Sequence, residues 1–231
     1  MGCDDLMKAR GPIRKLLEIM ATLRSPEGCP WDREQDHTSL RFHAVEEVYE
    51  LIDSIEAGDD HEMAEELGDL LLQVVFHCQL ASERGAFDFD TVCARISEKL
   101  IRRHPHVFGD SKCASVDAVW AQWEKIKKAE KAGTRHERPS ALDGVPKHLP
   151  ALMRCEKLTK KARKAGLVGG AEVKPTAKLK ARRRKEIASA LFDLGAEAQG
   201  LGLSAEELLR AETKARERAW RKAEAKQRPA S

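Results

Sequence analysis

The sequence has no long hydrophobic run. Its longest nearly apolar stretch, residues 70–76, is far shorter than the roughly 20 residues that a membrane-spanning helix needs. The N-terminus carries charges at Asp4, Asp5 and Lys8, where a signal peptide would have an apolar core. We therefore expect a cytoplasmic protein that has no membrane partner.

Paired cysteines and aromatic residues are also scarce. The six cysteines are scattered singly, without the Cys-x-x-Cys spacing that zinc sites and redox motifs use, so we expect reduced thiols. Only 5% of the residues are aromatic, with a single Tyr, whereas strands favour aromatic and β-branched residues. A composition of 42% hydrophobic and 34% charged residues therefore favours an all-α protein.

The two signs of charge are unequally distributed along the chain. Up to Met153 there are 20 Lys and Arg against 28 Asp and Glu, and from Arg154 onward there are 21 against 10, which gives the net charge of +3. The basic run 178–185 could neutralise nucleic-acid phosphates. A solvated basic helix that faces an acidic domain or a partner subunit explains the run at least as well, so a nucleic-acid partner is not our expectation.

Hydrophobic periodicity and helix-breaking residues divide the chain into helices. In the N-terminal part they predict helices over 6–23, 39–57, 60–84, from a cap at Asp90 to the residues before Pro105, and over 115–131. In the C-terminal part they predict helices over 151–165, 178–199 and 204–226. Because Gly and Pro are frequent from Gly133 to Pro150, we expect a catalytic domain at 1–133, a linker at 134–150 and a second helical region at 151–231.

The second predicted helix carries three crowded carboxylates. Its apolar residues share one face, which we expect to be core, and Glu46, Glu47 and Glu50 lie on the opposite face. Within the helix no Lys or Arg stands three or four residues away to offset them, and such repulsion destabilises a helix. A solvated acidic face is the alternative explanation, and it is the commoner one.

The third predicted helix is apolar almost all round, which predicts burial. Its polar residues Glu66, Asp69, Gln73 and His77 form one narrow stripe. Carboxylates buried on facing helices can share a divalent cation, and the oxygen preference of Mg²⁺ suits such a site. For His77 we expect a local hydrogen bond and no metal.

Cations for a polyphosphate are available on the next two helices. Lys99 and Arg103 stand four residues apart, hence on one helix face, and could hold phosphates. Trp123 and Lys127 have the same spacing, and an indole can stack on a base. The alternatives are ordinary solvated charges and a Trp packed in the core.

Taken in order, these segments resemble the MazG family of nucleoside triphosphate pyrophosphohydrolases, and the resemblance covers roughly residues 6–160. The motifs that carry it are Gly28-Cys-Pro-Trp-Asp32, Glu46-Glu-x-x-Glu50, Glu66-x-x-Asp69, Lys99-x-x-x-Arg103-His-Pro-His-Val-Phe108 and Trp123-Glu-x-Ile-Lys127. The resemblance implies an all-α fold and Mg²⁺-dependent hydrolysis between the α and β phosphates. The products would be a nucleoside monophosphate and pyrophosphate, in a role that clears unwanted nucleotides.

The resemblance also implies a role for each residue of these motifs. Four of them would bind Mg²⁺, namely Glu47, Glu50, Glu66 and Asp69. Glu46 would assist catalysis by orienting or deprotonating the attacking water, together with Glu50. The substrate-binding residues would be Lys99 and Arg103 at the phosphates and Trp123 and Lys127 near the base and sugar.

The C-terminal half departs from the pattern of two-copy members of the family. Glu186-Ile-Ala-Ser189 stands where Glu-x-x-Asp would be, although Lys214-x-x-x-Arg218 is retained. We therefore interpret residues 151–231 as a degenerate, metal-less copy. Because a short helical hairpin buries little surface alone, we expect a homodimer or a higher homo-oligomer. The alternatives are a relative specific for dUTP or a phosphoribosyl nucleotide, and a non-catalytic oligomerising or regulatory protein.

Overall fold

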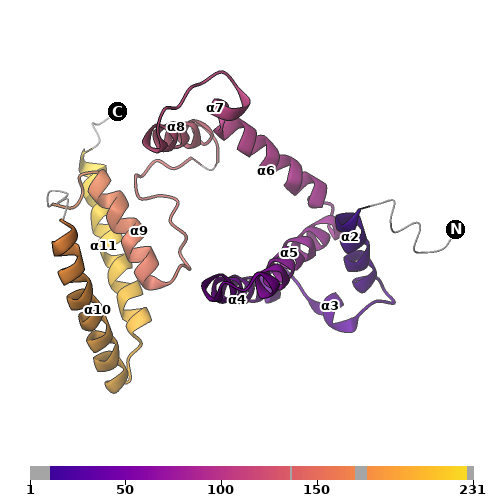
Figure 1. Cartoon of the computed structure of the whole chain (residues 1–231), viewed down its shortest axis with the longest axis horizontal. Helices are drawn as coiled ribbons and strands as arrows, with labels where there is room; N and C mark the ends of the chain where they lie inside the picture. The colour runs from indigo at the N-terminus through magenta and orange to yellow at the C-terminus, as the bar shows by residue number, and fades with distance from the viewer. Residues whose placement is uncertain (1–10, 136, 170–175, 228–231) are drawn as a thin grey trace. The chain divides into compact units, whose positions relative to one another are not determined.

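The computed structural model describes residues 11–135, 137–169 and 176–227, and every regular element in those residues is helical (Figure 1). All-α is therefore the fold class, as the composition predicts. The elements are α2 (Pro12–Leu23), α3 (Pro30–Glu34), the 3₁₀ turn η1 (Ser39–Arg41), α4 (His43–Ala57), α5 (Asp60–Glu83), α6 (Phe89–Arg103), α7 (Pro105–Phe108), α8 (Val116–Ala129), α9 (Ala151–Lys164), α10 (Ala177–Gly200) and α11 (Ala205–Gln227). The chain forms two compact units, residues 1–119 and 120–231.

The helices α4 and α5 form a tight antiparallel hairpin at the centre of the first unit. Gly58 ends α4 in the left-handed conformation, at φ 68°, which a residue without a Cβ adopts easily. Asp59 then caps α5, because its side chain accepts hydrogen bonds from the backbone N–H groups of His61 and Glu62. With a connection this short the two helices must run side by side, and they do so in Figure 1.

The core of the first unit lies at the C-terminal half of α5, where α2 packs against it. Its buried members come from α2, η1 and α5, and they are Met20, Leu40, Val75, Phe76 and Leu80. Arg24, just after α2, donates to both carboxylate oxygens of Glu83 at 2.6 and 2.7 Å. This bidentate ion pair ties the end of α2 to the end of α5.

The expected burial of the α4 apolar face and of the whole circumference of α5 is wrong for the single chain. On α4 the exposed apolar side chains are Val45, Val48, Tyr49, Ile52 and Ile55, and on α5 they are Leu67, Leu71 and Val74. The first half of α5 is covered mainly by α4, so its other sides remain open. Periodicity identifies an apolar face, but it does not identify what covers that face.

The predicted helix boundaries hold within a few residues, with one change of cap. Asp88, and not the predicted Asp90, caps α6 by accepting a hydrogen bond from the backbone N–H of Thr91 at 2.8 Å. Asp90 instead lies in the first turn of α6. The first helix begins at Pro12, and the predicted start at Leu6 lies outside the described residues.

The second unit is organised by α9 and α11, which pack together. Its core contains Leu142, Leu158 and Ala162, and Trp220 of α11 packs against them. Leu142 is only 1% exposed, although it belongs to the segment 134–150 that we predicted as a linker. The division between the units, at residues 119 and 120, falls within α8 and thus before that segment. The segment 134–150 belongs to the second unit because Leu142 packs against Leu158 and Ala162 of α9.

Charged side chains supplement this small core. Arg154 of α9, 6% exposed, donates to Glu217 of α11, and Arg221 bridges Glu217 at 2.8 Å and Asp143 at 2.7 Å. These hydrogen bonds keep the pKa of Glu217 and that of Asp143 below their ordinary values, although burial opposes the effect. Ionised groups are therefore part of the packing between α9, α11 and the segment before α9.

None of the described helices is long and apolar enough to cross a membrane. The five cysteines in the described residues carry free thiols, in agreement with their scattered positions. Cys3 lies outside the described residues.

Candidate metal and nucleotide site

Three carboxylates from the α4–α5 hairpin come together in the first unit. Glu47 on α4 and Glu66 and Asp69 on α5 each offer one oxygen, and these oxygens all lie within 4.8 Å of one another. We call Glu47, Glu66 and Asp69 the carboxylate triad. The antiparallel hairpin explains why these carboxylates lie close together. The turn of α4 that carries Glu47 faces the turn of α5 in which Glu66 and Asp69 stand three residues apart.

The triad is electrostatically unfavourable without a cation. Desolvation, and then the charges of Asp69 and Glu50, raise the pKa of Glu47 above its ordinary value. Desolvation, and then Glu50 and Asp69, raise the pKa of Glu66 in the same way. The charges that act most on both groups are carboxylates of α4 and α5. Partly buried oxygen ligands of this kind suit a hard divalent cation such as Mg²⁺, which would relieve the repulsion.

A buried amide lies beside the triad. Gln73, one turn after Asp69 on α5, is 7% exposed, and its Nε2 donates a long hydrogen bond of 3.4 Å to Oε1 of Glu47. Its own Oε1 is buried and accepts no hydrogen bond within the described residues. Gln73 belongs to the polar stripe predicted for this helix, and the stripe alone predicted no role for it.

The other two carboxylates of α4 lie at the margin of the triad. Glu50 is exposed and is absent from the set of oxygens within 4.8 Å, yet its charge raises the pKa of Glu47 and of Glu66. Glu46 is also exposed, and its Oε2 lies 3.7 Å from Nδ1 of His43. The ring of His43 in turn meets Trp31 edge to face at a centroid distance of 6.2 Å. His43 had no predicted role, and Trp31 was named only as part of the Gly28–Asp32 motif.

The four predicted substrate-binding residues lie on α6 and α8. Lys99 and Arg103 are half-buried and one turn apart on α6, as their spacing predicts. Trp123 and Lys127 are likewise one turn apart on α8, and the Lys127 ammonium lies 5.8 Å from the centre of the Trp123 ring. Lys127 also lies 3.5 Å from Glu124. These two residues belong to the second unit, whereas the triad belongs to the first.

His77 pairs with a histidine from a distant part of the sequence, and not with a neighbour on its own helix. Its Nδ1 lies 2.9 Å from Nδ1 of His37, and the two rings stack with their centroids 5.1 Å apart. Burial, and then the neighbouring His37, lower the pKa of His77. His37 precedes η1 in a segment without periodicity, so no sequence signal connected it with His77.

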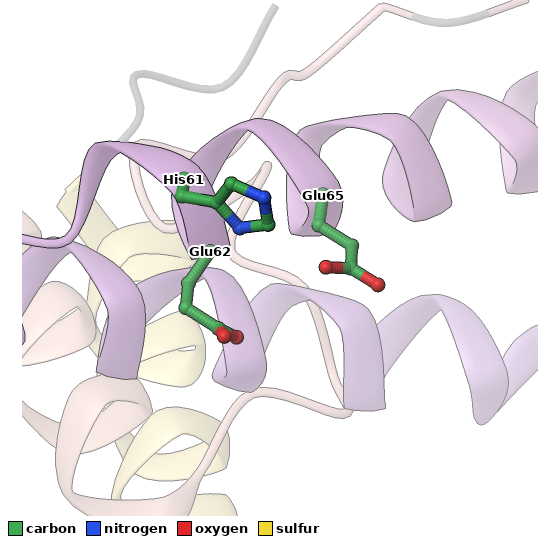
Figure 2. Close-up of side chains that lie close together, drawn as sticks. All are labelled: His61, Glu62 and Glu65. Atoms are coloured by element: carbon green, nitrogen blue, oxygen red, sulfur yellow. The ribbon is translucent and has the colours of Figure 1, made fainter.

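A second group of potential metal ligands lies at the start of α5. His61, Glu62 and Glu65 each offer one atom within 4.8 Å of the others, and Figure 2 shows their side chains gathered beside the helix. All three residues are exposed, so water competes fully for any ion there. No motif in the sequence predicted this group.

In the second unit, Glu186 is neutralised by its own helix. It lies 3.2 Å from Arg182 and 2.7 Å from Arg183 of α10, and the hydroxyl of Ser189 lies 3.3 Å from Asp193. Within the described residues, both groups of potential metal ligands lie in the first unit. The interpretation of 151–231 as a degenerate copy stays a prediction.

Comparison with known proteins places the triad inside a recognised domain. Residues 35–108 match the model of the MazG nucleotide pyrophosphohydrolase domain. A nucleoside triphosphate pyrophosphohydrolase of Escherichia coli (strain K12) is 50% identical over 155 residues, which are 67% of this chain and 58% of that protein. The nucleoside triphosphate pyrophosphohydrolase/pyrophosphatase MazG of Thermotoga maritima is 48% identical over 161 residues, covering 69% of this chain and 60% of that protein.

The chain thus spans about 60% of the length of these curated relatives. The crystal structure of a MazG-related protein from Thermotoga maritima aligns with a TM-score of 0.43 at 26% identity, over 50% of this chain and 98% of that one. The domain match contains the whole triad, and the two relatives extend the sequence similarity well beyond it. The chain therefore belongs to the MazG family of nucleotide pyrophosphohydrolases.

Proposed function

We propose that this chain hydrolyses nucleoside triphosphates to nucleoside monophosphates and pyrophosphate, with Mg²⁺ held by the carboxylate triad. The observation that carries the proposal is the convergence of Glu47, Glu66 and Asp69 within 4.8 Å, inside the segment that matches the MazG domain. Adjacent carboxylates repel one another, and for Glu47 and Glu66 desolvation and neighbouring carboxylates raise the pKa, so the cluster opposes folding. A divalent cation bound with substrate would remove the repulsion between these carboxylates, and this relief would favour its binding.

We assign the acidic residues the following roles. When bound, Mg²⁺ neutralises charge on the phosphates and lowers the pKa of a coordinated water. The triad would supply oxygen ligands, and in this proposal Glu50, whose charge acts on Glu66, would add a fourth. Glu46 lies outside the triad beside His43, and in this proposal its carboxylate orients the attacking water or accepts its proton.

The remaining predicted residues would hold the rest of the substrate. Lys99 and Arg103 on one face of α6 would bind the phosphates through charge-assisted hydrogen bonds. Trp123, with its face near the Lys127 ammonium, offers a surface on which any base can stack. Stacking does not read the identity of a base, so this arrangement favours a broad substrate range used to remove unwanted nucleotides from the cytoplasmic pool.

A homodimer is part of the proposal. The exposed apolar face of α4 includes Val48, Ile52 and Ile55, at 41%, 41% and 55% exposure. Contiguous apolar faces of this kind on a helix mark interaction surfaces, and a second copy of the chain would bury the same face by symmetry. Sedimentation equilibrium at micromolar concentration should therefore give twice the chain mass of 25.8 kDa.

One assay tests the function directly. Purified protein is incubated with Mg²⁺ and each common and modified nucleoside triphosphate, including dUTP, and with a phosphoribosyl nucleotide, and monophosphate and pyrophosphate are quantified. We expect both products, in equal amounts, from several triphosphates. Turnover of dUTP or the phosphoribosyl nucleotide alone would favour a narrow-specificity relative. No product from any of them, with the protein folded, would favour a non-catalytic protein.

A further inference from the structure

Gln73 is a buried polar residue that packing alone does not explain. It stands on α5 next to the core residues Val75 and Phe76, and it is only 7% exposed. A Leu or Met would fill the same volume without a polar atom to satisfy. The carboxamide instead meets the triad with its nitrogen, which donates to Glu47 at 3.4 Å.

The other end of the same carboxamide lacks a partner. Oε1 of Gln73 is buried and accepts no hydrogen bond within the described residues. Both atoms belong to one planar amide, so Oε1 is the second arm of the group whose Nε2 contacts Glu47. Buried side-chain acceptors are nearly always satisfied in native proteins, so an unmet one beside three potential metal ligands points to a ligand that brings a donor.

We propose that Gln73 is a positioning residue that fixes the Glu47 carboxylate through Nε2 and accepts, through Oε1, a hydrogen bond from a water bound to the triad's cation. This inference rests on the proposed function, because it takes the triad to be a cation site. Mg²⁺ keeps several of its waters when proteins bind it, and these waters are hydrogen-bond donors. Partners that hold a first ligand in place strongly affect the affinity of metal sites.

The test uses the full-length chain without nucleotide, so that cation binding is measured apart from turnover. Mn²⁺ replaces Mg²⁺ as an electron paramagnetic resonance probe, and free Mn²⁺ is titrated against wild type and Gln73→Met. We expect the variant to bind Mn²⁺ about 10 to 100 times more weakly, the range typical for losing such a partner. The signal of bound Mn²⁺ should also change, because a coordinated water loses its acceptor.

A matched control lies on the same helix. Gln79 is half-buried on α5 and donates to Glu83 at 3.1 Å, away from the triad. Gln79→Met makes the same chemical change, and it should leave Mn²⁺ affinity and the spectrum unaltered. In a Glu47→Gln background, Gln73→Met should cost much less than it does in wild type, because the contact between the two residues has already changed.

The outcomes separate this inference from the proposed function. If wild type binds Mn²⁺ and Gln73→Met binds it equally well with the same spectrum, Gln73 has no such role, whatever the turnover. If wild type binds no Mn²⁺ without nucleotide, this inference fails, and the pyrophosphate assay alone decides the proposed function. Circular dichroism checks the fold. Should Gln73→Met and Gln73→Leu both unfold, the amide is structural and the inference is overturned.

Discussion

Replacing Asp69 by Asn should have opposite effects with and without Mg²⁺. Asn keeps the shape of the side chain and removes one of the three charges that lie within 4.8 Å. At that separation a pair of unit charges repels by about 1 kcal/mol in the dielectric of water, and by several times more at the lower effective dielectric near a protein surface. In EDTA, Asp69→Asn should therefore be more stable than wild type, with a melting temperature a few degrees higher.

With Mg²⁺ present the order should reverse. A cation at 100 times its dissociation constant stabilises the wild type by about 2.7 kcal/mol, and Asp69→Asn should lose most of that gain together with turnover. Thermal unfolding in EDTA and in Mg²⁺, with pyrophosphate release, measures all three effects. Glu65→Gln, from the exposed group on the same helix, is the control and should behave as wild type. A variant Asp69→Asn that is destabilised in EDTA, or that keeps the full Mg²⁺ gain, would refute the reasoning.

Three further predictions concern other parts of the chain. Glu186→Ala should leave turnover unchanged, whereas Glu66→Ala should eliminate it; the reverse result in a pyrophosphate assay would move the active site to the second unit. Arg154→Ala should lower the free energy of unfolding of the second unit by about 1.5–3 kcal/mol, because the half-buried Glu217 loses one of its two cations and keeps Arg221. By contrast, Arg216→Ala, at an exposed pair, should cost under about 1 kcal/mol in the same urea titration. Because burial lowers the pKa of His77 from 6.5, the unfolded chain binds more protons, so stability should fall as pH drops below about 6.5; His77→Gln should flatten that slope in urea titrations.

Much of the first unit follows from local signals in the sequence. Gly58 and Asp59 punctuate the chain between two helical patterns, and the structure turns there. The stripe on α5 predicted that Glu66 and Asp69 share a face, and they do. Helix ends and helix faces depend on neighbours within four residues, so a sequence specifies them directly.

The parts that the sequence did not specify depend on how one helix rotates against another. A helical wheel places Glu46, Glu47 and Glu50 on one side of α4, but only the packing of α4 on α5 brings Glu47 into the triad and leaves Glu50 at its margin. The same rotation brings Gln73 to Glu47. Likewise His37 reaches His77 through the path of the segment before η1, which has no periodicity from which to predict it.

The carboxylate triad and the acidic side chains packed between α9 and α11 have opposite electrostatic surroundings, and this contrast supports placing the proposed active site in the first unit. In the second unit, carboxylates are matched by cations: Glu217 contacts Arg154 and Arg221, and its pKa is lowered. In the first unit, Glu47 and Glu66 have raised pKa values, because desolvation and other carboxylates act on them. Both units contain Lys and Arg residues that could form ion pairs with carboxylates. Clustered charge that the fold leaves uncompensated lowers stability, and natural proteins accept such a cost mainly at sites that bind or react.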